Sequence, residues 1–247
     1  MNKLRLICVG CEVLARPLYL CAAKSPHIVD IELIGKGLHE RPLELRSMLQ
    51  ERIQAVGGRG YDALVLAYGL CGRATSGLTA SEIPMVMPRA HDCITLFLGS
   101  RRRYEEQFHK NPGTFWYAQD YIERDDGLGT ELALGAAGEN LREKYQEYVT
   151  RYGEDNAEYL MEIMGAWGEH YQRAVFIDMG VNDASDVEMR AREEAGRRGW
   201  TFETLPGDLG LLNRLLHGDW NGDFLVLEPG QKVEMSYDGN VICGLCG

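Results

Sequence analysis

The chain carries thiol and imidazole side chains directly after three apolar runs that have the length of β-strands. Cys11 follows the run LRLICV, Cys71 follows YDALVLAYG, and His91 and Cys93 follow IPMVMP. Cysteine and histidine are ligands that zinc prefers, and three protein ligands with one open position are typical of a catalytic site. We therefore expect Cys11, Cys71, His91 and Cys93 to surround one zinc ion that binds a substrate thiol and deprotonates it near neutral pH.

Two other chemistries use the same side chains. Three cysteines on one rim also suit an iron-sulfur cluster whose fourth position is taken by His91 or by an exogenous ligand. Without a metal, Cys93 in the first turn of a helix beside His91 and Arg89 would have a lowered pKa and act as a nucleophile, with His91 as the base. In the zinc interpretation Arg89 would hold an anionic group of the substrate.

The glycine-rich stretch GLCGRATSG around Cys71 is typical of a loop whose backbone amides cradle an anion. This interpretation assigns a binding role to four residues: Gly69, Gly72, Ser76 and Gly77.

The remaining cysteines have simpler interpretations. Free cysteines are often small buried hydrophobes, and we assign that role to Cys8, inside a strand, and to Cys21, in an apolar neighbourhood. The terminal pair Cys243 and Cys246 forms a CxxC motif that could reach the site as a tail or lie at an exposed end. Among the carboxylates near strand ends, Asp178 is a candidate for orienting a ligand.

Strand-length apolar runs and helical spacing alternate along most of the chain, and this rhythm is typical of parallel strands joined by right-handed helical crossovers. Helices are expected after the strands, including Cys93–Ser100 behind the N-cap candidate Asp92. The expected strands are 4–9, 28–35, 61–69, 83–88, 111–122, 173–180, 200–207 and 223–230, with a hairpin around YDGN near the end. The fold class is therefore α/β, an open and mainly parallel sheet with helices on both faces, Rossmann-like, with a helical insert.

The expected domain organisation has three parts. Residues 1–131 form a first α/β half that carries the Cys/His site, and residues 132–172, which turn helical and acidic, form an insert or cap. Residues 173–247 form a second α/β half within the same domain or beside it.

Composition excludes several classes of protein. With a formal charge of -11 and no concentrated basic footprint, the chain is not expected to bind nucleic acid. No window approaches the roughly 20 apolar residues that span a bilayer, and no leader peptide is recognisable. We therefore expect a cytoplasmic protein, in which the seven cysteines are thiols, metal ligands or redox groups rather than disulfides.

Several strings of the sequence resemble the uncharacterised family catalogued as domain of unknown function 1638. The resemblance rests on CEVL, YGLCG, PRAHDCITLFLGSR, NPGTFWY and LLHGDWNGDFLVLEPGQ, which together are spread over most of the chain. Members of that family often accompany corrinoid-dependent methyltransferase systems, so the resemblance implies one-carbon chemistry. It also implies a corrinoid cofactor or a methyltransferase partner as an alternative, with the chain as an accessory protein that has no turnover of its own.

The ligand types are similar to those of zinc enzymes that methylate a thiol from a methylated corrinoid. Those enzymes use a His-x-Cys pair and a distant cysteine, which matches His91, Cys93 and Cys71 in residue type. Here the distant cysteine precedes the pair, and the chain does not have the rhythm of an eight-fold β/α barrel. The likeness implies a small-molecule substrate, either a thiol or a methylated compound.

Overall fold

The computed structural model describes residues 2–111, 113–124, 171–236 and 240–246, which form two compact units. The first unit contains residues 1–105, 179–183 and 206–247, and the second contains 106–178 and 184–205. The expected second half, 173–247, thus contributes to both units. Apart from residues 171 and 172, the expected insert 132–172 lies outside the described residues.

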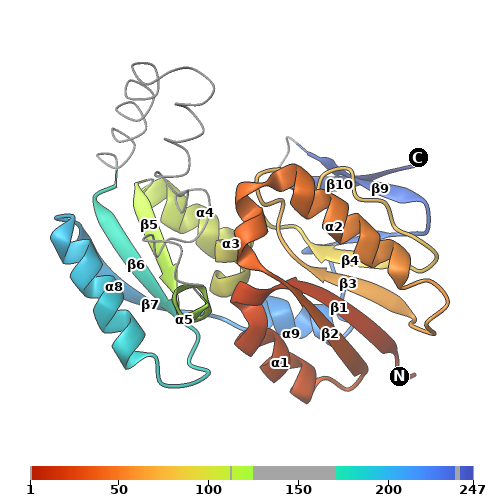
Figure 1. Ribbon diagram of the computed structural model, residues 1–247, viewed down its shortest axis with the longest axis horizontal. Helices are drawn as coiled ribbons and strands as arrows, with labels where there is room; N and C mark the ends of the chain where they lie inside the picture. The colour runs from red at the N-terminus through yellow and green to blue at the C-terminus, as the bar shows by residue number, and fades with distance from the viewer. Residues whose placement is uncertain (1, 112, 125–170, 237–239, 247) are drawn as a thin grey trace. The chain divides into compact units, whose positions relative to one another are not determined.

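A five-stranded sheet forms the centre of the first unit, in the order β2-β1-β3-β4-β8 (Figure 1). Strands β2, β1, β3 and β4 are parallel, and β8 pairs antiparallel with β4. The bounds are β1 Arg5–Cys11, β2 Ile28–Ile34, β3 Ala63–Ala67, β4 Met85–Pro88 and β8 Phe224–Leu227. The expectation of an open, mainly parallel sheet is confirmed.

Helices cover this sheet because its central strands are apolar on both faces: every residue of β3 and of β4 is buried. Helices α1 and α9 contact each other, and α9 also contacts β3 and β4. The chain moves from β1 outward to β2 and then back to β3, so right-handed crossovers place α2 on the face opposite α1 (Figure 1). The helices of this unit are α1 Ala15–Lys24, α2 Pro42–Ala55, α3 Cys93–Leu98 and α9 Gly210–Leu216, with 3-10 turns η1 Glu12–Leu14 and η2 Lys36–Glu40.

The expected hairpin at the end of the chain is present as an antiparallel pair, β9 Gln231–Met235 and β10 Ile242–Cys246. Strand β9 also forms backbone hydrogen bonds with the loop that follows β3. The Gly77 amide donates to the Val233 carbonyl at 2.8 Å, and the Val233 amide donates to Leu78 at 2.8 Å. The loop that carries Cys71 is therefore held from outside the main sheet.

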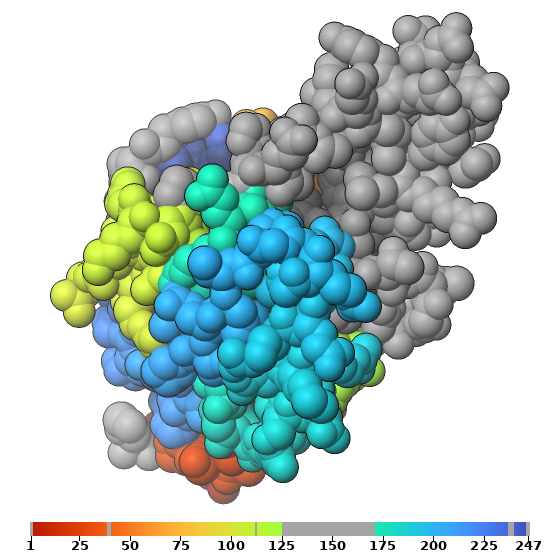
Figure 2. All heavy atoms as spheres, turned by 90° about the vertical axis from the view of Figure 1, so that its left-hand side faces the viewer, coloured from red at the N-terminus to blue at the C-terminus, as the bar shows by residue number. Residues whose placement is uncertain are grey.

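The second unit is built on a separate three-stranded sheet, in the order β5-β6-β7. Helix α8 packs on it through Val187, Ala191 and Ala195, and many of its other residues are charged. The second unit faces the viewer in Figure 2. The elements are β5 Thr114–Ala118, α5 Gln119–Glu123, β6 Arg173–Asp178, α8 Ser185–Arg197 and β7 Thr201–Pro206, and α4 Arg101–Lys110 begins in the first unit and ends in this one.

The strand expected over 111–122 is shorter than predicted. Strand β5 ends at Ala118, and the chain turns at once into α5. An ion pair between Arg124 and Asp120, one helical turn apart at 3.3 Å, accompanies this turn. The apolar residues Tyr121 and Ile122 therefore belong to a helix rather than to the strand.

In the described part of the chain, no helix is long and apolar enough to cross a membrane.

Candidate functional site

The carboxyl ends of β1 and β3 lie side by side at the point where the strand order reverses. In doubly wound sheets the loops diverge at such a point and leave a crevice, which is where these folds bind ligands. Cys11 is the last residue of β1, and the loop after β3 carries Cys71. Cys93 is the first residue of α3, which follows the next strand, β4. The sheet thus brings three thiols from three separate strands to one edge.

The three thiols lie close enough for the charge of one to affect the pKa of another. Burial raises the pKa of Cys71 well above its ordinary value, and the negative charges of Asp92 and Cys11 raise it further. The pKa of Cys93 is raised by burial first, and then by Asp92, Cys71 and Cys11. Cys11 and Cys93 are almost fully enclosed, with 1% and 7% of their surface exposed, whereas Cys71 keeps partial exposure. The expectation that the pKa of Cys93 is lowered is therefore wrong, because burial outweighs the helix terminus.

Two loops are clamped together to form this site. The Leu70 amide donates to the Ala90 carbonyl at 2.8 Å, and the Cys71 amide donates to the His91 carbonyl at 2.9 Å. A Cβ on Gly69 would lie 2.6 Å from the Asp92 nitrogen, so only glycine permits this backbone contact. The clamp fixes the separation of the segments that carry Cys71 and Cys93.

The loop after β3 holds an unfavourable backbone conformation at Cys71. Cys71 has a φ of 46°, and it is followed by Gly72 at 61° and Arg73 at 72°, so three consecutive residues are left-handed. Such a conformation is costly for residues other than glycine, and it persists only where the surrounding structure enforces it. Here the buried Thr75 donates its hydroxyl to the Gly69 carbonyl at 3.0 Å and braces the loop from inside.

The backbone amides of Ser76 and Gly77, which were expected to bind an anion, instead donate to carbonyl groups of the protein. The Ser76 amide donates to Arg73 at 3.2 Å, and the Gly77 amide donates to Val233. Gly72 and Gly77 supply left-handed backbone, and Gly69 supplies a close approach. The three glycines thus shape the loop, and a binding role for Gly69 and Gly72 stays a prediction.

Arg89 and His91 are placed differently from the sequence-based expectation. The Arg89 guanidinium donates to the Ile242 carbonyl of β10, so it contacts the final hairpin. The His91 side chain is exposed, and its ring stacks on Tyr104 with 5.7 Å between centroids. The Tyr104 hydroxyl in turn donates to Asp92 at 3.5 Å.

Asp92 caps α3 as expected: one carboxylate oxygen accepts the Ile94 and Thr95 amides at 3.0 and 3.3 Å. Its second role was not foreseen, since the carboxylate also acts on the pKa values of Cys71 and Cys93.

Tyr68 is a site residue that the sequence reasoning missed. It is buried directly after β3, and the thiols of Cys11 and Cys71 both act on its pKa, which burial raises strongly. Its position immediately after a buried strand was a usable signal. No such signal existed for Tyr104, because Tyr104 lies twelve residues after Asp92, with α3, a turn and the start of α4 between them.

The other cysteines lie elsewhere. Cys8 and Cys21 are buried in the core of the first unit, as predicted. Cys243 is half-buried in β10 opposite Glu234, and the side chain of Cys246 lies outside the described residues. Asp178 ends β6 in the second unit. As the described side chains stand, no three cysteine, histidine or acidic residues are grouped so that they could hold a metal ion.

Fold and site together define an α/β protein with a doubly wound, mainly parallel sheet and three thiols at its switch point, two of them buried and that of Cys71 partly exposed. The chain belongs to the family described as Protein of unknown function (DUF1638), whose model matches residues 33–216. That range contains Cys71 and Cys93, and Cys11 precedes it. No curated protein matches the chain, and no solved structure does.

Proposed function

We propose that Cys11, Cys71 and Cys93 form a metal-thiolate site, and that the protein is an enzyme that activates a small thiol or methylated substrate there. The observation that carries the proposal is the convergence of three thiols from three strand ends on the switch point of the sheet. This is the place at which such folds bind their ligands.

The protonation state of the thiols favours a metal over a bare nucleophile. With pKa values raised by burial, Cys71 and Cys93 are neutral thiols at pH 7, and a neutral thiol is a poor nucleophile. A soft divalent cation reverses this preference because it binds the thiolate and displaces the proton. Binding would draw the sulfur atoms in to about 2.3 Å from the ion.

Three cysteine ligands leave one coordination position for a substrate, which is the arrangement of catalytic zinc sites. A metal held by these cysteines would lower the pKa of a substrate thiol, which would release its proton to solvent. The thiolate would then form its S–C bond with a methyl group as the bond between that group and its donor breaks, and the donor would leave with the electron pair. His91 lies between β4 and α3, two residues before Cys93. We propose it as the fourth metal ligand before the substrate binds. Methyl transfer itself is part of the proposal through the family resemblance alone.

An iron-sulfur cluster is the second candidate, and the same observation favours it. Three cysteines from separate segments, with no fourth one beside them among the cysteines whose side chains the structure describes, also suit a cluster with one exchangeable position. In that case the protein would serve as an accessory of a methyltransferase system, and a corrinoid-carrying partner would be its natural counterpart.

Elemental analysis and an absorption spectrum of protein purified without oxygen distinguish these candidates. We expect zinc in a one-to-one ratio with the chain and no visible band. Iron with sulfide and a broad visible absorption would replace the zinc site with a cluster. Protein that has no metal and takes up neither zinc nor iron would overturn both.

Serine variants test the ligand set. Cys11→Ser, Cys71→Ser and Cys93→Ser should each lose metal, while Cys21→Ala, which changes a buried cysteine elsewhere in the first unit, should keep it. In cobalt-substituted protein, each serine variant should also lose part of the sulfur-to-cobalt absorption in the near ultraviolet. Full metal content in all three serine variants would show that the thiols are not ligands.

A further inference from the structure

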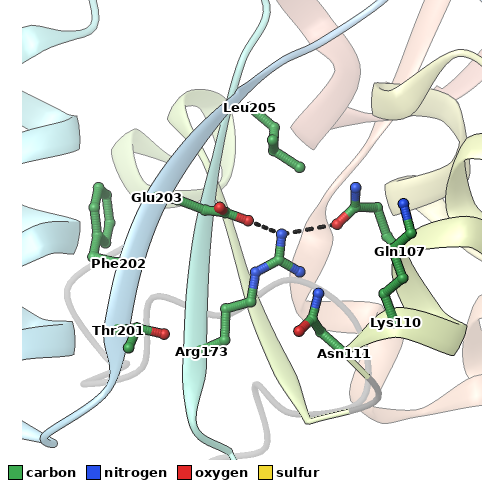
Figure 3. A pocket seen from close by; sticks show the side chains of 8 residues that line it. All are labelled: Gln107, Lys110, Asn111, Arg173, Thr201, Phe202, Glu203 and Leu205. Carbon is green, nitrogen blue, oxygen red and sulfur yellow. Dashed lines mark hydrogen bonds and ion pairs between the residues drawn. The ribbon is translucent and has the colours of Figure 1, made fainter.

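The second compact unit contains a polar pocket that is separate from the thiol site. It has a volume of about 430 Å³ and is formed by the end of α4, the start of β6 and the length of β7 (Figure 3). Its lining residues are Gln107, Lys110, Asn111, Arg173, Thr201, Phe202, Glu203 and Leu205.

Arg173 lies at the centre of the pocket and is held in a defined position. Its guanidinium donates to Gln107 Oε1 at 2.8 Å and to Thr114 Oγ1 at 3.1 Å, and it forms an ion pair with Glu203 (Figure 3). The Arg173 side chain is only 13% exposed, and its burial lowers the pKa of the guanidinium. A rigid, partly desolvated guanidinium of this kind is suited to binding a planar or tetrahedral oxyanion.

Donors outnumber acceptors around this arginine. Lys110 adds a second positive charge, and within the described residues no carboxylate pairs with it. Because Gln107 accepts from Arg173 through its oxygen, its amide nitrogen is left to donate elsewhere. Among the described residues that line the pocket, Glu203 is the only acidic one. Figure 3 shows Gln107, Lys110 and Asn111 across the pocket from β7, on the side that faces Arg173.

We propose that this pocket binds a small molecule through a carboxylate or phosphate group, which contacts Arg173 and Lys110 in the place that the Glu203 carboxylate takes in the structure. The Glu203 side chain is 47% exposed, so it can turn into water when a ligand arrives. This movement breaks the ion pair with Arg173, and the incoming anion replaces the lost charge contact to the guanidinium. Leu205 offers apolar contact for the body of the ligand, whereas the Phe202 ring points to the other face of β7, where it packs under Arg192 (Figure 3).

Titration calorimetry on the full chain tests the proposal, with inorganic phosphate and succinate as separate probes at low ionic strength. We expect at least one of them to bind with one site per chain. Lys110→Gln should weaken binding about tenfold, the effect of losing one charged contact. Glu203→Gln should strengthen it several-fold, because the competing carboxylate is gone while a hydrogen bond to Arg173 is kept.

Arg190→Gln is the matched control, because it removes a positive charge from the exposed side of α8 in the same unit. It should leave the affinity unchanged. Binding of phosphate alone or succinate alone would name the oxyanion class, and binding of both would support the shared chemistry. The proposal is overturned if neither anion binds, if Arg190→Gln weakens binding as much as Lys110→Gln, or if Glu203→Gln weakens it. None of these outcomes depends on the thiol site.

Discussion

Burial, rather than a neighbouring cation, is the main cause of the raised pKa values of four cysteines in the first unit: Cys8, Cys21, Cys71 and Cys93. For Cys8, burial raises the pKa from its ordinary value of 9.0 to about 12, and for Cys21 to about 11. The pKa values of Cys71 and Cys93 are also raised, first by burial and then by the carboxylate of Asp92. The two structural cysteines and the two site cysteines thus all have a pKa that burial raises. Cys71 and Cys93 differ from Cys8 and Cys21 in that they lie at the carboxyl edge of the sheet, near Asp92.

A stability profile against pH follows from these pKa values. Below pH 9 both the folded and the unfolded protein keep the thiols protonated, so the stabilisation is fully present. Between pH 9 and about 12 the unfolded chain ionises at Cys8 while the folded chain does not, and the free energy of unfolding falls. Urea unfolding of the metal-free protein at several pH values should show this fall.

Cys8→Ala provides the control, since it removes the thiol that has the widest window. The variant should lose stability at pH 7 through the change in packing, but its dependence on pH above 9 should be shallower than that of the wild type. An equal slope in the two proteins would contradict the assignment.

The left-handed backbone at Arg73 supports a second prediction at this scale. Arg73 has a φ of 72° and an exposed side chain, and the partners of its carbonyl do not depend on the side chain. Arg73→Gly should therefore raise the free energy of unfolding by about 0.5 kcal/mol, because relief of the strain exceeds the added freedom of the unfolded chain. A loss of stability in chemical denaturation would show that the side chain itself stabilises the loop.

At the scale of elements, the end of α3 determines how the segment carrying Cys93 leads into α4. Gly99 ends α3 with a φ of 70°, and a Cβ there would lie 2.6 Å from the Asp208 carbonyl oxygen. The Asp208 amide donates to the Phe97 carbonyl at 2.9 Å, so the two segments are joined at this contact.

Gly99→Ala should therefore destabilise the protein by about 3 kcal/mol, from the left-handed backbone and the clash together. Gly180→Ala is the matched control, because Gly180 has a φ of 60° but open space around its Cβ position. It should cost about 1 kcal/mol. Thermal and chemical unfolding measure both variants. If Gly99→Ala and Gly180→Ala lose the same stability, the contact with Asp208 does not resist the added methyl group.

At the scale of the whole molecule, the proposed metal would be coupled to folding. Ligands that bind only the folded state stabilise it, and zinc at 100 times its dissociation constant should add about 2.7 kcal/mol to the free energy of unfolding. Calorimetric unfolding with and without zinc measures this gain. Cys93→Ser should show little of it, and an equal gain in that variant would place the metal elsewhere.

The same coupling predicts the sign of a pH effect on affinity. Each thiol with a raised pKa must release a proton when the metal binds, so the apparent affinity should fall steeply as the pH is lowered from 8 to 6. Competition with a chelator of known pH dependence gives the measurement. An affinity that does not change with pH would argue against thiolate ligands.

The sequence by itself determined the elements and the strand ends that carry the thiols. Buried runs such as Ala63–Ala67 and Met85–Pro88 are apolar at every position, and helical spacing between them indicates crossovers, so a parallel sheet followed from local pattern. Because parallel strands end at one edge, the placement of Cys11, Cys71 and Cys93 at the same edge of the sheet followed from the same reasoning.

Only the tertiary structure decided which strands pair, and which groups surround the thiols. Strands β5, β6 and β7 have the same alternating rhythm as the others, yet they form a sheet of their own, since strand pairing depends on contacts that no local window contains. The partner of Arg89 lies 153 residues further on, at Ile242, where no spacing rule could find it. The pKa of Cys93 is raised rather than lowered because burial and Asp92 act together, and burial exists only once the chain has folded around the thiol.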